Sequence, residues 1–122
     1  METLTKTLLI VDSSVIIRDR LLEALIEHQT VRNILIAADF DQAVKILEET
    51  PAHYALLDIQ LIGKNGLDLL KFFSQTYPTM KVIMFTNLAD DNYEKVARQF
   101  GAIHFLDKSR DFDKIPGLLA KL

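Results

Sequence analysis

The chain has 122 residues, of which 49% are hydrophobic and 25% charged, and its formal net charge is −3. This length and composition suit one globular domain with a sizeable apolar core. The absence of cysteine excludes disulfides and thiolate metal sites, and the scattered basic residues form no stripe of the kind that binds nucleic acid. Without a signal-peptide pattern or an apolar run of membrane-spanning length, we expect a cytoplasmic protein.

The first predicted elements are a strand and a helix. Residues Thr7–Val11 are a continuous apolar run, which is typical of a strand buried on both faces. Ser13 or Ser14 can cap the following helix, which we expect to extend to about Gln29. This first unit predicts an α/β fold if the alternation continues.

The alternation does continue through the middle of the chain. Asn33–Ala37 is the second predicted strand, and Asp39 opens a helix as the first member of a capping box that Gln42 completes. Tyr54–Asp58 is the third strand, and the third helix covers Gly66 to about Thr76. Pro51 and Tyr77-Pro78 mark the ends of the two helices.

Two more units complete the pattern. Lys81–Thr86 is the fourth predicted strand, and the helix that follows opens at Asp90 or Asp91 and closes at Gly101. We expect the fifth strand at Ala102–Leu106 and the last helix from Asp111 or Asp113. Strands alternating with helices imply a parallel sheet covered by helices on both faces. The fold class is therefore α/β, a doubly wound (βα)5 fold of the flavodoxin-like strand order 2-1-3-4-5.

Polar residues stand at the ends of four predicted strands. Asp12 follows the first strand, Asp58 and Thr86 end the third and fourth, and Lys108 lies just past the fifth. Ligands bind at the carboxyl ends of the strands in open α/β sheets, and strands one and three are neighbours in the order 2-1-3-4-5. We therefore expect Asp12 and Asp58 to share one crevice, with Thr86 and Lys108 beside it.

These residue types indicate phosphate chemistry. Two carboxylates with backbone carbonyls suit a hard cation such as Mg²⁺. The Lys108 ammonium and the Thr86 hydroxyl suit phosphoryl oxygens, and Asp58 is the candidate nucleophile.

From Lys6 to Leu122 the sequence resembles the receiver domain of two-component response regulators. The resemblance is carried by four short motifs, each at the end of a predicted strand: Leu9-Ile10-Val11-Asp12; Leu56-Leu57-Asp58-Ile59-Gln60-Leu61 with Gly63 and Gly66; Phe85-Thr86; and Gly101-Ala102 with Phe105-Leu106-Asp107-Lys108-Ser109. Each motif alone is weak, but together and in this order they are specific. The resemblance implies one stand-alone receiver domain over residues 1–122, with no output domain.

The resemblance also implies residue roles. Asp58 would accept a phosphoryl group from a histidine kinase or phosphotransfer protein, and Lys108 would pair with the acceptor and its phosphoryl group. Mg²⁺ would be held by Asp12, Asp58 and the backbone carbonyl of Gln60. Thr86 would shift to bond the phosphoryl oxygen, as part of the switch.

The remaining implied features concern signalling. Phe105 takes the place of the family's switch aromatic. A downstream protein would bind the face made by the last two helices and the fifth strand, and the protein would be either a monomer or a weak dimer through the same face. The function implied is that of a phosphorylation-dependent switch, not of a conventional enzyme, and no direct binding to nucleic acid or membrane is expected.

The sequence departs from the family pattern at three positions. Ser13 stands where the family usually has a second acid, and because even indirect changes around a metal cost about 10–100-fold in affinity, we expect weak Mg²⁺ binding. Ile62 replaces the common proline before Gly63, and Asn87 is larger than the small residue usual after the switch threonine.

Three alternatives remain open. A degenerate receiver would act by protein contact without phosphate, and Ser13 supports this alternative. A small aspartyl-phosphate phosphatase would require an acid at Gln60, two residues after the nucleophile. A nucleotide- or flavin-binding module would require a glycine-rich loop after the first strand, where Val11-Asp12-Ser13-Ser14 has none.

Overall fold

The computed structural model describes residues 6–28, 31–88 and 90–122. Its elements alternate between strand and helix, apart from one short 3-10 helix, η2. In chain order they are β1 (Thr7–Val11), α1 (Val15–His28), β2 (Asn33–Ala37), α2 (Phe40–Glu49), β3 (Tyr54–Leu57), α3 (Gly66–Thr76), β4 (Lys81–Thr86), α4 (Asp91–Gln99), β5 (His104–Asp107), η2 (Phe112–Lys114) and α5 (Ile115–Lys121). The strands form one parallel sheet of order β2-β1-β3-β4-β5, as predicted.

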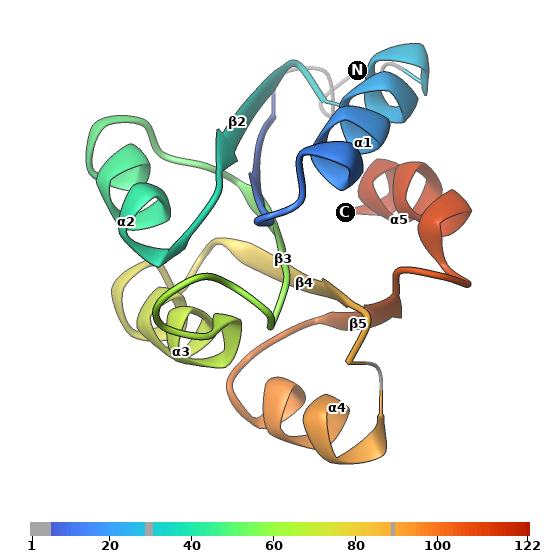
Figure 1. The fold of residues 1–122 in the computed structure, drawn as a ribbon. Helices are drawn as coiled ribbons and strands as arrows, with labels where there is room; N and C mark the ends of the chain where they lie inside the picture. The colour runs from blue at the N-terminus through green and yellow to red at the C-terminus, as the bar shows by residue number, and fades with distance from the viewer. Residues whose placement is uncertain (1–5, 29–30, 89) are drawn as a thin grey trace.

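Helices lie on both faces of the sheet (Figure 1), and an apolar layer lies between the sheet and the helices on each face. Along β1, Leu8 and Ile10 point to the layer beneath α1 and α5, whereas Leu9 and Val11 point to the layer beneath α2, α3 and α4. Neighbouring strand residues point to opposite faces, so a strand buried on both faces must be apolar throughout. This explains the continuous apolar runs in the sequence.

Helix starts follow the capping residues in the sequence. Ser14 Oγ accepts the Ile17 N–H at the start of α1, and Asp90 Oδ1 accepts the Tyr93 N–H at the start of α4. Asp39 accepts the Gln42 N–H, but the reciprocal bond of the predicted capping box goes from the Ala38 N–H to Gln42 Oε1. The predicted end of the first helix, Gln29, lies outside the described residues.

Three predicted boundaries were wrong. The ladder of β3 ends at Leu57 rather than Asp58. The fifth strand begins at His104 rather than Ala102, because the Ala102 N–H caps the preceding helix by bonding the Ala97 carbonyl. The last α-helix begins at Ile115, after the 3-10 turn at Phe112–Lys114, rather than at Asp111 or Asp113.

The turn that carries Asp58 depends on the close approach of Gly66. A Cβ at position 66 would overlap the Asp58 carbonyl oxygen and lie 2.8 Å from Ile59 Cα. The Gly66 N–H also donates to the Ile59 carbonyl at 2.8 Å. The first residue of α3 therefore packs directly against the backbone of the candidate site.

We predict that Gly66→Ala lowers the free energy of unfolding by about 1–3 kcal/mol, because an inserted methyl group in a filled space forces backbone movement. Gly117→Ala is the matched control: no atom lies within 4 Å of its Cβ position, and alanine in a helix should raise stability by about 0.5–1 kcal/mol. Urea unfolding of both variants measures the difference. Equal stability of the two variants would contradict the close approach at Gly66.

Candidate functional site

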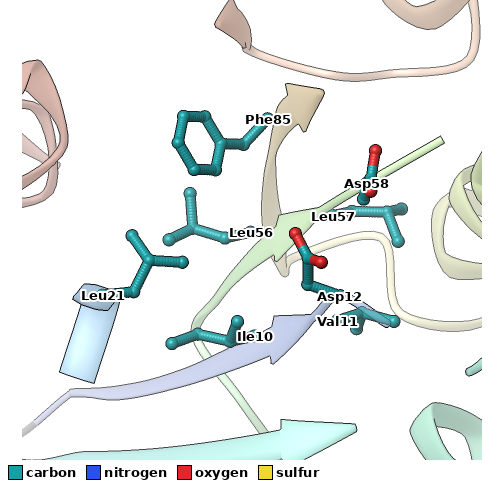
Figure 2. A pocket seen from close by; sticks show the side chains of 8 residues that line it. All are labelled: Ile10, Val11, Asp12, Leu21, Leu56, Leu57, Asp58 and Phe85. Atoms are coloured by element: carbon teal, nitrogen blue, oxygen red, sulfur yellow. The ribbon is translucent and has the colours of Figure 1, made fainter. Parts of the chain in front are cut away.

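The carboxyl edge of the sheet brings together Asp12, Asp58 and Lys108, as the sequence predicted. Each acid follows the last residue of its strand, and backbone bonds hold it there: the Asp12 N–H donates to Ala37 O and the Asp58 N–H to Val11 O, both at 3.1 Å. Both acids are buried, with residue exposures of 2% and 3%. Figure 2 shows the two carboxylates beside apolar side chains that include Ile10, Leu56 and Phe85.

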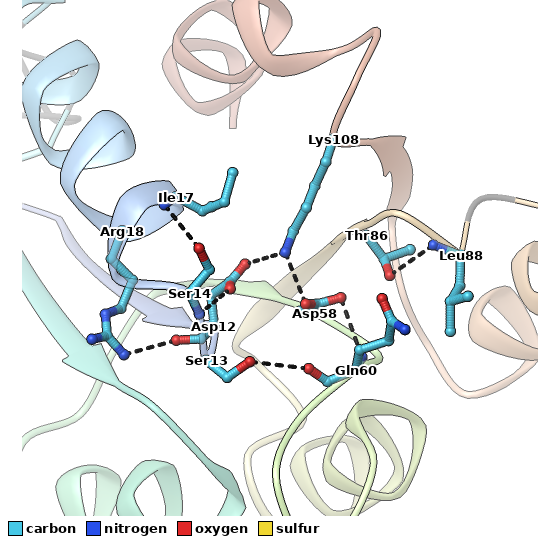
Figure 3. A network of polar contacts seen from close by, with 10 residues as sticks. All are labelled: Asp12, Ser13, Ser14, Ile17, Arg18, Asp58, Gln60, Thr86, Leu88 and Lys108. Atoms are coloured by element: carbon cyan, nitrogen blue, oxygen red, sulfur yellow. Dashed lines mark hydrogen bonds and ion pairs between the residues drawn. The ribbon is translucent and has the colours of Figure 1, made fainter.

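Lys108 joins the two acids. Its Nζ lies 2.6 Å from Asp12 Oδ2 and 2.8 Å from Asp58 Oδ2, and its side chain is only 7% exposed (Figure 3). The Lys108 backbone N–H donates to Thr86 O at 3.1 Å, which holds the lysine at the edge of the sheet. One ammonium therefore bridges two carboxylates in a place with little access to water.

The other carboxylate oxygens are bound by backbone groups. Asp12 Oδ1 accepts the Ser14 N–H at 2.8 Å, and Asp58 Oδ1 accepts the Gln60 N–H at 3.2 Å. Within the part of the chain that the structure describes, no buried side-chain nitrogen or oxygen lacks a hydrogen-bond partner. The buried polar side-chain atoms of the site therefore all have hydrogen-bond partners within the protein.

Burial and pairing have opposite effects on the pKa values. Burial raises the pKa of Asp12 above its ordinary value of 3.8, although the hydrogen bonds from Lys108 and Ser14 oppose the rise. For Lys108, burial acts to lower the pKa, but the hydrogen bonds and negative charges of Asp12 and Asp58 outweigh it and hold the pKa above 10.5. Lys108 therefore remains charged, and its positive charge offsets part of the free-energy cost of burying two carboxylates.

Thr86 and Phe105 lie on the far side of Asp58 from Asp12. Thr86 is fully buried, and its Oγ1 accepts the Leu88 N–H at 3.2 Å rather than contacting Asp58. Phe105 is partly buried, pairs in register with Met84, and packs against the core layer of α2, α3 and α4. The predicted switch residues therefore lie on adjacent strands, and the Thr86 hydroxyl is engaged within its own loop.

Two contacts of the site were not predicted. Arg18, on α1, donates from Nη1 to the Asp12 carbonyl at 2.9 Å. Ser13 Oγ donates to the Gln60 carbonyl at 3.4 Å and so connects the loop after β1 with the loop after β3. Only the place of Arg18, one turn into the helix that follows Asp12, could have indicated its contact from the sequence.

The donor set available to a metal ion is small. No cluster of three or more His, Cys, Asp or Glu side chains suited to a metal occurs among the described residues. The oxygen donors near the crevice are the carboxylates of Asp12 and Asp58 and the carbonyl of Gln60, which are of the type that Mg²⁺ prefers.

Comparison with known proteins assigns the chain and its fold to one family. A family model described as the response regulator receiver domain matches residues 8–120. The chain belongs to this family. Receiver domains are signalling switches of two-component systems; they interact with histidine kinases or phosphotransfer proteins and generally bind Mg²⁺ at the phosphorylation site.

Among its relatives is a putative NtrX-like response regulator of Rickettsia conorii, 34% identical over 109 residues. That match covers 78% of this chain and 23% of the relative, so the chain spans about a quarter of the relative's length. A CheY-like receiver protein from Methanospirillum hungatei superposes with a TM-score of 0.83 at 28% identity, covering 96% of this chain and 95% of the other. The BeF3-activated DrrB receiver domain shares the fold, with a TM-score of 0.85, 19% identity and 96% coverage of both chains.

No described helix is long and apolar enough to span a bilayer.

We predict that Lys108→Met lowers the free energy of unfolding by on the order of 3 kcal/mol at neutral pH, because it leaves two buried carboxylates without a counter-charge. The loss should shrink as pH falls through the raised pKa of Asp12, since a folded state that favours the protonated acid gains stability as protons bind. It should also shrink above pH 10.5, where wild type loses the contribution of charged Lys108 as pH rises through the lysine's raised pKa.

Urea unfolding of both proteins across pH measures this difference. Lys114→Met is the matched control, because Lys114 pairs with Asp111 at the surface with a side chain 67% exposed, and such pairs contribute little. A pH-independent loss in Lys108→Met would show that the ion pair is not its cause.

Proposed function

We propose that this protein is a phosphorylation-dependent signalling switch in which Asp58 accepts a phosphoryl group from a histidine kinase or phosphotransfer protein. The observation that carries the proposal is the buried Asp58 carboxylate at the tip of β3, with Lys108 Nζ at 2.8 Å. An ion pair that only stabilised the fold could lie anywhere in the core. The Asp58–Lys108 pair lies at the carboxyl edge of the sheet, where α/β proteins bind ligands, and this position favours a reactive role for Asp58 over a purely structural one.

The proposed reaction is a phosphoryl transfer to Asp58. A carboxylate oxygen of Asp58 attacks the phosphorus of a phosphohistidine, so an O–P bond forms while the P–N bond breaks. The electron pair of the broken bond stays on the imidazole nitrogen, which takes up a proton. Lys108 remains charged and pairs with the new phosphoryl oxygens, and the developing charge is therefore met by a cation already in place.

The oxygen ligands at this site fit Mg²⁺, and we expect them to bind it with modest affinity. Asp12, Asp58 and the Gln60 carbonyl would hold Mg²⁺, which would supply charge neutralisation to the phosphoryl oxygens. Few protein charges are required, because Mg²⁺ usually keeps several waters. Ser13 contributes no negative charge where a second acid would otherwise stand.

The switch would act through Thr86 and Phe105. In the present state Thr86 Oγ1 accepts the Leu88 N–H. A phosphoryl group on Asp58 offers the Thr86 hydroxyl an acceptor instead, and the exchange of partners would move the loop between β4 and α4. A ligand shifts an equilibrium only between states that it binds differently, and this hydrogen bond supplies the difference.

Partner surfaces follow from this arrangement. Phe105 lies on β5, and the loop after Thr86 leads into α4, so we propose the α4–β5–α5 face as the surface for a downstream protein and for a weak dimer. We propose a cytoplasmic location, where a kinase would meet this domain. The proposal includes no direct contact with nucleic acid by the described residues.

A degenerate receiver that works without phosphate is the competing function, and Ser13 is the observation that favours it. The phosphatase alternative is weaker, because the position two residues after Asp58 is Gln60, which supplies no acid.

We predict that wild type incorporates phosphate from acetyl phosphate and that Asp58→Asn does not, because an amide is not a nucleophile for this transfer. Asp41→Asn, at an exposed position of α2, is the control and should behave as wild type. Intact-mass spectrometry reads the added phosphate. Equal incorporation by Asp58→Asn would overturn the assignment, and no incorporation by any of the three proteins would favour the degenerate receiver.

We predict that beryllofluoride, which imitates a phosphoryl group on the acid, changes amide chemical shifts from Asp58 across to residues 90–110. Thr86→Ala should confine the changes to the surroundings of Asp58, because the exchangeable hydroxyl is lost. Two-dimensional NMR measures both patterns. Long-range changes that persist in Thr86→Ala would show that the Thr86 hydroxyl does not transmit the signal.

A further inference from the structure

The turn that carries Lys108 is closed by Asp111. Asp107, the last residue of β5, donates its backbone N–H to Asp111 Oδ2 at 2.9 Å, and its carbonyl accepts the Asp111 N–H at 2.8 Å. In the described sheet β5 is an edge strand, so it has a neighbouring strand on one side alone. The two bonds to Asp111 therefore fix the end of β5 and enclose Lys108 in a closed turn.

The Lys108 backbone is also held on its other sides. Asp107 Oδ1 accepts the Ser109 N–H at 2.7 Å, and the Lys108 N–H donates to Thr86 O on β4 at 3.1 Å. Figure 3 shows the long Lys108 side chain reaching from this turn to the two buried carboxylates, which its Nζ contacts at 2.6 and 2.8 Å. The position of the ammonium therefore depends on a backbone that Asp107 and its partners hold.

The carboxylate of Asp111 is not used as a helix cap. An acid just before a helix usually accepts a backbone N–H of the first turn. Asp111 precedes η2, but its side chain makes no such bond to the described backbone of that helix. The hydrogen bond from the Asp107 N–H, together with the bond from Lys114 Nζ, lowers the pKa of Asp111 below its ordinary value of 3.8. Asp111 thus stabilises the turn before it rather than the helix after it.

These contacts lead to one inference, which rests on the proposed function. We infer that Asp111 is a positioning residue for phosphoryl transfer: through Asp107 it holds the Lys108 backbone where the ammonium can meet phosphoryl oxygens on Asp58. A lysine ammonium is carried on a flexible four-carbon stem, so a looser backbone would spread its position. Asp111 bonds to Asp107 and Lys114, and it acts on the reaction through Lys108.

Three substitutions separate this role from a general effect of charge. Asp111→Ala removes the acceptor of the Asp107 N–H. Asp111→Asn loses the charge but keeps an amide oxygen that can accept the same N–H. Asp113→Ala is the matched control, because Asp113 is an exposed acid of η2 and its replacement changes the net charge by the same amount as Asp111→Ala.

The first measurement is NMR of the Lys108 side-chain ammonium in isotopically labelled protein. In wild type this ammonium, whose side chain is 7% exposed, should exchange its protons slowly with water and give a distinct signal. Asp111→Ala should shift or broaden the signal, whereas Asp111→Asn and Asp113→Ala should retain it. A purely structural role of Asp111 would lower stability without moving this signal.

The second measurement is the rate of phosphate incorporation from acetyl phosphate with Mg²⁺, followed by intact-mass spectrometry. Asp111→Ala should react about tenfold or more slowly than wild type, since misplacement of a catalytic group by about 1 Å can cost about a hundredfold. Asp111→Asn and Asp113→Ala should react at nearly the wild-type rate. Urea unfolding checks that each variant is folded under the assay conditions.

A further variant covers the case in which Asp111→Ala does not fold. Asp111→Glu keeps the charge but places the carboxylate one methylene further from the backbone, which misaligns it with the Asp107 N–H. It should therefore change the Lys108 signal and slow the reaction. A wild-type signal and rate in folded Asp111→Glu would then overturn the inference.

The outcomes separate this inference from the proposed function. If wild type incorporates no phosphate, the proposed function is wrong. If wild type incorporates phosphate and Asp111→Ala matches Asp113→Ala in both measurements, the proposed function stands and the inference is overturned. A slower reaction of Asp111→Ala with an unchanged Lys108 signal would also overturn the inference, because Asp111 would then act by a route other than Lys108.

Discussion

The bridge from Lys108 to Asp12 and Asp58 is the interaction on which the rest of the site depends. Strands β1 and β3 are neighbours, and an acid stands just past each, so the topology places two carboxylates in one buried crevice. Burial disfavours the charged form of such an acid, and it raises the pKa of Asp12, with a smaller contribution from the nearby Asp58 carboxylate. The ammonium from the end of β5 makes the pair tolerable. The cation that stabilises the two buried acids is thus also the one that would meet a phosphoryl group under the proposed function.

The parallel sheet supplies the precision of this arrangement. Strands β1 and β3 are buried along their whole length, so their register is fixed by the apolar layers under the helices, and the acids just past their ends are fixed with them. Gly66 adds a second constraint from behind, where α3 begins against the Asp58 backbone with no room for a Cβ. A carboxylate held by a rigid strand and a close helix start loses little further freedom when it reacts, which favours transfer.

The sequence was sufficient for the sheet order and for the meeting of Asp12, Asp58 and Lys108, because these follow from strands whose apolar runs are continuous. It did not predict the start of β5, where Ala102 is apolar yet its N–H caps α4. It also did not predict Arg18 on the Asp12 carbonyl, the Ser13 bond to Gln60, or the Thr86 hydroxyl turned to Leu88. These features depend on side-chain rotamers and loop paths, which periodicity does not encode.

A site with all its partners satisfied has a consequence for signalling. Under the proposed function, a phosphoryl group on Asp58 would compete with Asp12 for Lys108, and it would draw the Thr86 hydroxyl away from the Leu88 N–H. Each exchange replaces one hydrogen bond by another, so the net free energy is a small difference between similar terms. Small differences of this kind leave two conformations close in energy, and a population shift then requires only modest differential binding. The hydrogen bonds and ion pairs that stabilise the site without a phosphoryl group would therefore also allow one added charge on Asp58 to shift the conformational equilibrium.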